Sequence, residues 1–370
     1  TGAYRWAKAF GGTGWDRLGD LGIDSKGNLY LTGYFPGTID FGGGTLTSAG
    51  HSEIFLASFT SSGAHRWSKR FGGDRYDQAY ALTVDGTDNV TICGAFQRTV
   101  SFGGASLSSA YYARYDAFLA SFTSSGTHRW SKRFGESAAH EFGKHVVATA
   151  GGDVIMAGLF QHAVDFGGGA LTSAGGYDIV LAGYTSSGNY RWSKRFGGAQ
   201  SEGVSGLTVD TTGRAYLTGS FHDPLDLGGG MLKSAGSDDI YLASYTSKGA
   251  HRWSKRMGGV PGDYGNALAI DATGDVIITG RFGSLLDLGG GLSLKSFGAN
   301  DVYVAAFSEA GVPRWARHLG GTSWDSAAAI AAGPQGALVL TGFFEKSADF
   351  GGGPMSSAGL QDIFVTRWVE

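Results

Sequence analysis

The feature that most constrains this chain is a nine-residue phrase that returns at a nearly fixed interval. It reads HRWSKRFGG at 65–73, and variants of it begin at residues 4, 128, 190, 251 and 313. The arginine before each tryptophan falls at Arg5, Arg66, Arg129, Arg191, Arg252 and Arg314. Successive arginines are therefore 61, 63, 62, 61 and 62 residues apart. Such a period indicates the architecture before any local pattern is considered.

Each repeat contains four short β-like runs. In the fourth repeat they are YRWSKRF (190–196), GLTVD (206–210), AYLTGSF (215–221) and DIYLASYT (239–246). The runs are rich in β-branched and aromatic residues and are separated by glycine-bearing turns. The 65 glycines, 13% aromatic residues and only 16% charged residues fit an all-β protein with many tight turns. We therefore predict a single six-bladed β-propeller over residues 1–370, with four antiparallel strands per blade. The predicted repeats are 4–64, 65–127, 128–189, 190–250, 251–312 and 313–370.

The two ends of the chain predict how the ring closes. The chain begins with YRWAKAF, a run that elsewhere follows DIYLASYT, and it ends with DIFVTRWVE, the counterpart of DIYLASYT. We predict that the N-terminal strand pairs with the C-terminal strands, which would remove two open strand edges.

The repeated phrase itself is basic and aromatic, which suggests either a scaffold element or a binding element. In an extended phrase, His65, Trp67, Lys69 and Phe71 lie on one side. We interpret the phrase as the outer strand, with Trp67 and Phe71 filling the seam between neighbouring blades because large aromatics stabilise chiefly by burial. A sugar-stacking platform on the outer rim is the alternative.

The repeat pattern resembles a known family. It runs W-S-K-R-F-G-G, then V-D-x-x-G-x-x-Y-L-T-G-x-F, then D-F-G-G-G-x-L-x-S-A-G and D-I-F-L-A. This pattern resembles bacterial β-propeller repeats of the SBBP type over essentially the whole chain. The resemblance implies an extracellular or cell-surface location and no defined chemistry.

Bulk properties exclude several classes of partner. The formal net charge of -3 argues against nucleic acid, and no apolar run approaches the length needed for membrane insertion. The single cysteine, Cys93, excludes a disulfide within the chain and lies in an apolar run, so we expect a buried thiol. The first residues, TGAYRW, lack a signal-peptide pattern, as expected of a cytoplasmic protein or of a processed form. We expect a monomer.

One acidic residue follows the phrase in every repeat. The six are Asp16, Asp77, Glu141, Glu202, Asp263 and Asp325. We favour a local interpretation, in which each accepts backbone N–H bonds within its own loop. Alternatively, six carboxylates near one axis would raise one another's pKa values or bind a cation, with calcium the natural choice. No other cofactor is expected.

The recurring DFGGG and DLGGG segments are predicted to be capped turns rather than phosphate loops, because no helix or Lys-Ser/Thr pair follows them. Their capping residues would be Asp40, Asp165, Asp226, Asp287 and Asp349, with Ser101 in the second repeat.

Residues that break the repeat are better candidates for function. The third repeat departs most, with FGESAAHEFGKH at 134–145. Its His140, Glu141 and His145, together with His162, could ligate a metal or supply acid–base groups, although their spacing matches no zinc signature. A second irregularity is SAYYARYDAF at 109–118, whose tyrosines and arginine suit recognition. The candidate ligand-binding residues are Trp15, Arg75, Tyr76, Arg98, His140, His162, His222, Arg281 and Trp324.

These patterns favour a binding module that recognises a glycan or a protein at the channel-mouth face. An enzyme, a lyase or hydrolase centred on the third repeat, is the first alternative. It would use His140 or His145 as base and Glu141 as acid, with Arg75 or Arg98 holding an anion. The second alternative is a structural spacer that binds no small ligand. The residue beside each acid varies between repeats, which favours one asymmetric site over six equal ones.

Overall fold

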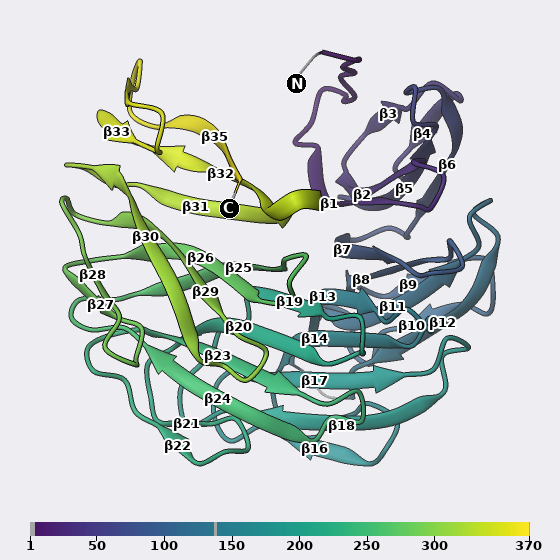
Figure 1. The fold of residues 1–370 in the computed structure, drawn as a ribbon. Helices are drawn as coiled ribbons and strands as arrows, with labels where there is room; N and C mark the ends of the chain where they lie inside the picture. The colour runs from purple at the N-terminus through teal and green to yellow at the C-terminus, as the bar shows by residue number, and fades with distance from the viewer. Residues whose placement is uncertain (1–3, 137–138, 370) are drawn as a thin grey trace. The chain divides into compact units, whose positions relative to one another are not determined.

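The computed structural model describes residues 4–136 and 139–369. It divides into two compact units, each of which is described by itself (Figure 1). Unit 1 comprises Thr1–Ser173 and Ile179–Arg195, and unit 2 comprises Ala174–Asp178 and Phe196–Glu370. Among the residues described, no helix is long and apolar enough to cross a membrane.

Unit 1 contains three four-stranded sheets, with strand orders β1-β2-β5-β6, β7-β8-β11-β12 and β13-β14-β17-β18. The first consists of β1 (Arg17–Ile23), β2 (Leu29–Phe35), β5 (Glu53–Phe59) and β6 (His65–Phe71). The second consists of β7 (Asp77–Val84), β8 (Val90–Phe96), β11 (Asp116–Phe122) and β12 (His128–Phe134). The third consists of β13 (Phe142–Ala148), β14 (Val154–Phe160), β17 (Asp178–Tyr184) and β18 (Tyr190–Phe196). Small hairpins join the second and third strands of each sheet: β3 (Thr38–Asp40) with β4 (Thr45–Thr47), β9 (Thr99–Val100) with β10 (Leu107–Ser108), and β15 (Ala163–Asp165) with β16 (Ala170–Thr172).

Unit 2 continues the pattern. Its first sheet has the order β19 (Gly206–Val209), β20 (Ala215–Phe221), β23 (Asp239–Tyr245) and β24 (His251–Met257). The next begins with β25 (Tyr264–Ile270), β26 (Val276–Phe282), β29 (Asp301–Phe307) and β30 (Pro313–Gly321), and a hairpin of β33 (Ser347–Asp349) and β34 (Pro354–Ser356) extends it. The last has three strands, β31 (Ser326–Ala332), β32 (Ala337–Phe344) and β35 (Asp362–Val369). The remaining elements are the hairpins β21 (Leu225–Asp226) with β22 (Met231–Leu232) and β27 (Leu285–Asp287) with β28 (Ser293–Lys295), and a 3-10 turn, η1 (Pro334–Gly336).

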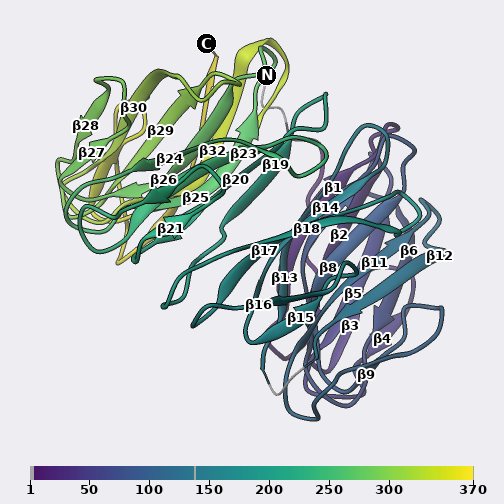
Figure 2. The same cartoon turned by 90° about the horizontal axis from the view of Figure 1, so that it is seen from below.

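The cores lie between successive sheets. In unit 1, Leu56 of the first sheet packs in one cluster with Ile92 and Phe118 of the second. Figure 2 shows β5, β8 and β11, the strands that carry these residues. The third strand of most sheets is buried along its whole length, as in β5 and β11. Residues on both faces of these strands are covered, which explains why they are nearly continuous apolar runs rather than alternating ones.

In five of the six sheets, the second strand carries a glycine beside a shift in the register of the first strand. The register between β7 and β8 shifts between Ala79 and Ala81. A Cβ on Gly94 would lie 2.0 Å from the carbonyl oxygen of Gln78. This close approach of two backbones requires glycine.

The repeated phrase is scaffold, as predicted. The indole Nε1 of Trp67 donates to the carbonyl oxygen of Ser124, in the turn of the next sheet, at 3.0 Å. Trp130 and Trp253 make the same bond to Ser186 and Glu309 at 2.9 Å. Each tryptophan therefore fastens its outer strand to the sheet that follows.

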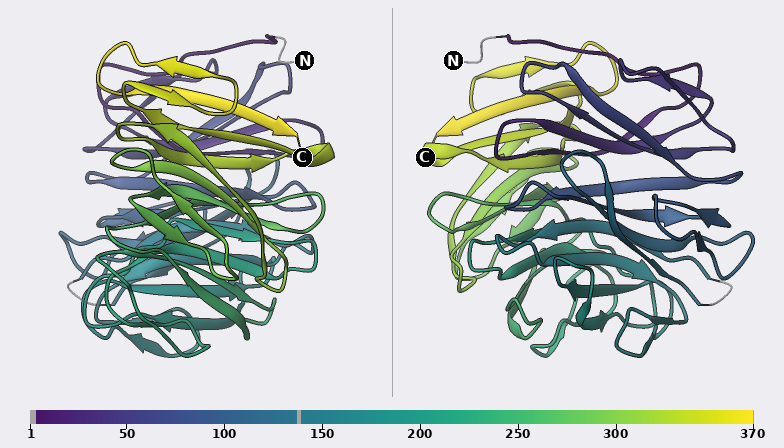
Figure 3. Two further views of the ribbon diagram at one scale, coloured as in Figure 1. Left: turned by 60° about the vertical axis from the view of Figure 1, so that its left-hand side comes forward. Right: turned by 90° about the vertical axis from the view of Figure 1, so that its right-hand side faces the viewer.

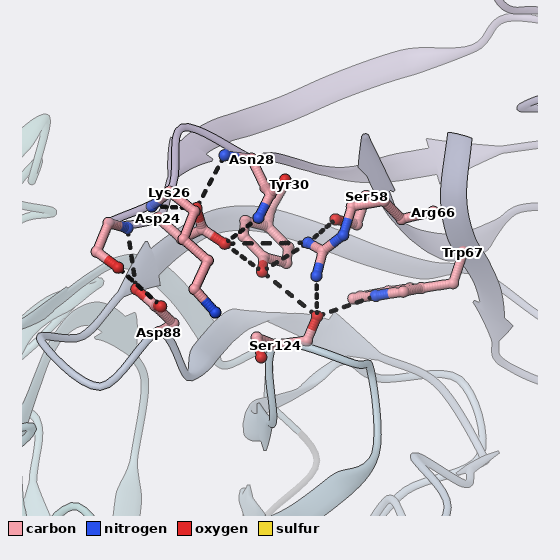
Figure 4. Close-up of polar contacts among 10 residues, drawn as sticks. Asp24, Lys26, Asn28, Tyr30, Ser58, Arg66, Trp67, Asp88 and Ser124 are labelled. Carbon is pink, nitrogen blue, oxygen red and sulfur yellow. Dashed lines mark hydrogen bonds and ion pairs between the residues drawn. The ribbon is translucent and has the colours of Figure 1, made fainter. Parts of the chain in front are cut away.

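The arginine of the phrase completes this fastening (Figure 4). Arg66 donates to the hydroxyls of Tyr30 and Ser58 and to the same Ser124 carbonyl that Trp67 binds. Asp24 accepts bonds from the Asn28 side chain and from the Tyr30 hydroxyl. Burial alone would raise the pKa of Asp24, but these and two backbone hydrogen bonds outweigh it and lower the pKa. Arg66, one of the basic residues of the phrase, is thus bound within the fold.

The N-terminal segment contacts the first sheet as an outer strand of a preceding repeat would. Trp6 Nε1 donates to the Ser61 carbonyl at 3.1 Å, which is the bond that Trp67 makes one repeat later. The ring of Phe10 lies 5.1 Å from both Phe41 and Phe59. The equivalent distances from Phe71 to Phe102 and Phe122 are 5.3 and 5.2 Å.

Closure of the ring stays a prediction. Residues 4–16 carry no strand, and the sheet of β35 has three strands instead of four. β35, the yellow C-terminal strand in Figure 3, is an edge strand, and Ile363 and Val365 on it are largely exposed. The all-β architecture of repeated four-stranded antiparallel sheets supports a β-propeller, whereas six blades and their closure are not established.

Candidate functional site

Five of the six acidic residues that follow the phrase are tied into their own loops, as we favoured from the sequence. Glu141 is the exception, because both of its carboxyl oxygens are buried without a hydrogen-bond partner. The backbone N–H of Gly73 donates to Asp77 Oδ2 at 2.8 Å, and Gly259 donates to Asp263 Oδ2 at 2.7 Å. The glycine four residues before Asp16, Glu202 and Asp325 makes the same bond. The predicted caps of the glycine turns are also present, for example Gly42 N–H on Asp40 Oδ1 at 2.7 Å.

Each of five loop acids faces a second carboxyl that sequence reasoning missed. This partner is the first residue of a third strand, and the pairs are Asp77 with Glu53, Glu141 with Asp116, Glu202 with Asp178, Asp263 with Asp239, and Asp325 with Asp301. A Cβ on Gly258 would lie 2.5 Å from Asp239 Oδ1 and 3.0 Å from Asp263 Oδ2, so both carboxyls border the same small space. The available signal was an acidic residue opening the third strand in every repeat.

Burial, followed by repulsion from the partner, raises the pKa of these loop acids. The pKa rises to about 7 for Asp77, Glu202 and Asp263 and to about 8 for Glu141. Our alternative interpretation attributed such a rise to repulsion within a ring of six carboxylates, whereas burial is its main cause and the strand acid adds to it. These carboxyls are fully or almost fully covered by the fold.

The third repeat does not assemble the acid–base group that its sequence suggested. Glu141 is completely buried, and His145 lies within β13 rather than in the loop. His162 is exposed in a separate turn. His140 Nε2 lies 2.8 Å from Arg114 Nη1, and burial together with the Arg114 charge lowers the His140 pKa. Within 4–136 and 139–369, no three His, Cys, Asp or Glu side chains are grouped to hold a metal ion.

Three loops of unit 1 bring arginine and tyrosine side chains together. They are the β6–β7 loop, the turn after β8 and the long loop after β10. We call their shared face the Arg–Tyr surface, defined by Asp74, Arg75, Tyr76, Arg98, Tyr111 and Tyr112. Two of the predicted ligand-binding residues, Arg75 and Arg98, converge here on Tyr112, which lies in the predicted recognition loop.

Tyr112 is the centre of this surface. The Arg98 guanidinium carbon lies 3.8 Å from the centroid of the Tyr112 ring, and that of Arg75 lies 5.0 Å from it. Arg75 Nη2 also donates to the Tyr112 hydroxyl at 2.9 Å, and this bond, followed by the charges of Arg75 and Arg98, lowers the Tyr112 pKa. Tyr111 and Tyr112 remain 56% and 55% exposed. Large aromatic faces and guanidinium donors are thus held in place while open to solvent.

Polar bonds fix the loops that carry these side chains. Gln97 Nε2 donates to the Ala113 carbonyl at 3.2 Å, and the Arg98 N–H donates to Ser109 Oγ at 2.9 Å. Tyr76 stacks on His51 with ring centroids 4.7 Å apart. Arg98 also forms an ion pair with Asp74.

Arg98 holds a backbone conformation that disfavours a side chain. Its φ is 62°, in the left-handed region, and the first repeat has Gly37 at this position with a φ of 68°. His162, Ser284 and Lys346 occupy the same position of later repeats, also with positive φ. Non-glycine residues in this region cost about 1 kcal/mol and are kept where something else requires them. Arg98 and Lys346 are positively charged and His162 is so when protonated, whereas Ser284 is neutral.

The other predicted ligand-binding residues lie elsewhere. In unit 2, Arg281 lies over the rings of Tyr264, at 4.0 Å, and Trp324, at 5.8 Å, which forms a smaller aromatic–cation group. Trp15 is 80% exposed with Arg17 5.5 Å from its ring, and His222 is exposed.

Comparison with known proteins assigns no family. No family model matches the chain. Over 138 residues, or 36% of this chain, the sequence is 29% identical to the regulatory protein FlaEY of Caulobacter vibrioides, and the match spans 14% of that protein.

Solved structures with a similar course of the chain include the Pan2 WD40 domain of Neurospora crassa, with 9% identity and a TM-score of 0.44 over 90% of this chain and 86% of that one. A Hadza microbial sialidase is 11% identical, with a TM-score of 0.43, over 88% of this chain and 63% of that one. A gluconolactonase of Xanthomonas campestris is 11% identical, with a TM-score of 0.37, over 85% of this chain and 87% of that one. The assignment of the fold rests on the sheets of this chain itself.

Proposed function

We propose that this protein is a binding module, at the cell surface or outside the cell, that docks a partner on the Arg–Tyr surface of unit 1. The observation that carries the proposal is the exposed Tyr112 held between Arg75 and Arg98. Tyrosine and arginine dominate the energetics of protein interfaces because they bury large areas and keep polar groups available. Loops already fixed by hydrogen bonds lose little conformational freedom on binding.

A protein partner fits this surface better than a neutral sugar. One face of the Tyr112 ring is covered by Arg98 at 3.8 Å, which leaves less aromatic face for stacking a sugar ring. The enzyme alternative has less support, since Glu141, its intended acid, is fully buried.

An array of glycans and peptides, probed with the wild-type protein and with Tyr112→Ala, tests the proposal. Trp324→Ala is the matched control, since it removes an exposed aromatic beside an arginine in unit 2. We expect Tyr112→Ala to lose the array signal and Trp324→Ala to keep it. A signal that survives Tyr112→Ala would remove the Arg–Tyr surface as the site. No signal from the wild type on any probe would favour the structural spacer.

We also propose that the six predicted blades close into a ring, with Tyr4–Phe10 completing the sheet of β35. The support is that Trp6 and Phe10 make the contacts of an outer strand, while β35 leaves apolar residues exposed. On β1, Leu18, Leu21 and Ile23 are exposed as well, as expected of a face that another blade should cover. Amide hydrogen exchange tests closure: slow exchange at residues 5–9 and 363–367 is expected, and fast exchange in both segments would contradict it.

A further inference from the structure

The ion pair within the Arg–Tyr surface shows what kind of group the surface accepts. Asp74 contacts Arg98 Nη1 while the guanidinium stacks on Tyr112, and the Asp74 side chain is 57% exposed. A carboxylate therefore reaches Arg98 from the solvent side without disturbing the stacked tyrosine. Guanidinium groups bind carboxylates with strong, directional hydrogen bonds.

The charge of the surface is also suited to an acidic ligand. The loops that form the surface carry three positive charges, at Arg75, Arg98 and Arg114, and the exposed carboxylate of Asp74 is paired with Arg98. Two buried carboxyls of the adjoining loops, Asp77 and Glu141, have pKa values that burial raises to about 7 and about 8.

Resting on the function proposed above, we infer that the Arg–Tyr surface binds an acidic protein segment, whose Asp or Glu carboxylate replaces Asp74 on Arg98 while its neighbouring residues pack on Tyr111 and Tyr112. Asp74 occupies the position of the ligand carboxylate in the free protein and competes with it.

The chain offers a closely matched control for Arg98. Lys346 holds the same left-handed turn position in unit 2, with a φ of 57°. Its N–H donates to Ser357 Oγ at 3.0 Å, as that of Arg98 does to Ser109 Oγ. Arg98→Gly and Lys346→Gly each remove one positive charge and relieve the same strain. Only Arg98→Gly removes the group that we infer to bind the ligand.

Asp74 has a control of its own in Asp88. This residue lies in the turn between β7 and β8, at the opposite end of the sheet, where it accepts bonds from Ser25 (Figure 4). Asp74→Asn and Asp88→Asn therefore change the net charge of the protein equally.

The experiment measures binding of a short oligo-glutamate peptide by titration calorimetry, with the oligo-glutamine peptide and oligogalacturonate as comparison ligands. We expect the wild type to bind oligo-glutamate only, and Arg98→Gly to weaken it by about tenfold, as expected for a charge-assisted hydrogen bond. Asp74→Asn should strengthen binding by about threefold, the scale of one exposed ion pair. Lys346→Gly and Asp88→Asn should leave it unchanged. Both glycine variants should unfold at a higher temperature than the wild type, which shows that lost binding is not lost folding.

Equal weakening by Arg98→Gly and Lys346→Gly, or no effect of Asp74→Asn, would overturn the inference. So would binding of oligogalacturonate in place of oligo-glutamate, which would indicate an acidic glycan. Absence of oligo-glutamate binding, together with an array signal that Tyr112→Ala abolishes, would refute the acidic partner and leave the proposed function standing.

Discussion

Asp263→Asn should change how the stability of the protein depends on pH. Asp263 is fully buried beside Asp239, and burial first and the Asp239 charge second raise its pKa from 3.8 to about 7. The folded state therefore binds the proton more tightly than the unfolded state does. This contribution to stability is fully present below pH 4 and is lost as the pH rises toward 7.

The size of the effect follows from the shift. Between pH 5 and pH 8, the free energy of unfolding of the wild type should fall by on the order of 2–3 kcal/mol because of this one carboxyl. The figure takes about 1.4 kcal/mol for each unit by which the folded-state pKa exceeds 5. Asparagine carries no titrating proton and keeps a side-chain oxygen to accept from Gly259 N–H. The free energy of unfolding of Asp263→Asn, measured relative to that of the wild type, should therefore rise by the same amount between pH 5 and pH 8.

Urea unfolding followed by tryptophan fluorescence at both pH values measures the difference. Asp226→Asn, at an exposed turn residue, is the matched control and should show no such gain. If the stability of Asp263→Asn relative to the wild type is the same at pH 5 and pH 8, the carboxyl is not protonated in the folded protein and the reasoning fails. If calcium at pH 8 stabilises the wild type and not Asp263→Asn, the pair binds a cation, as our alternative interpretation of the sequence had it.

Three further outcomes are expected from the scaffold. Trp67→Ala should lower the free energy of unfolding by about 3 kcal/mol, because it removes a packed aromatic and its bond to Ser124; unchanged urea unfolding would refute the scaffold role of the phrase. Gly94→Ala should lower the melting temperature strongly, because its Cβ would lie 2.0 Å from the Gln78 carbonyl oxygen, whereas Gly352→Ala, with open space around it, should not. Cys93 should not react with a thiol reagent until urea unfolds the protein, since it is fully buried and burial raises its pKa; rapid native reaction would show that its strand opens.

The period of the sequence predicted the sheets because each repeat must form the same local elements. The positions that all repeats share, such as Trp67 and Phe71, proved to be contacts between one sheet and the next. The turns were equally predictable. Asp40 and Asp77 accept hydrogen bonds from backbone N–H groups no more than four residues away, so the local sequence is enough to predict these bonds.

Contacts between separate loops were not predictable in the same way. Tyr112 meets Arg75 across 37 residues, and no periodic pattern indicates how two irregular loops approach each other. The carboxyl pairs were missed for a related reason, since Asp239 and Asp263 come from a strand and a loop, and only the packed structure buries them together. In the third repeat, Glu141 is fully buried and His145 lies within β13, and these placements depend on packing that the spacing of the residues does not indicate.

Hydrogen–deuterium exchange of the wild-type protein, with and without the tightest ligand found on the array, tests the central claim most directly. The account predicts that protection on binding is concentrated in residues 72–77, 96–99 and 109–115, which carry the Arg–Tyr surface. The repeated phrases, such as 65–71 and 251–257, should show no change. Protection confined to the phrases, or to the loops around Trp324, would contradict the claim that the residues departing from the repeat in unit 1 form the binding site.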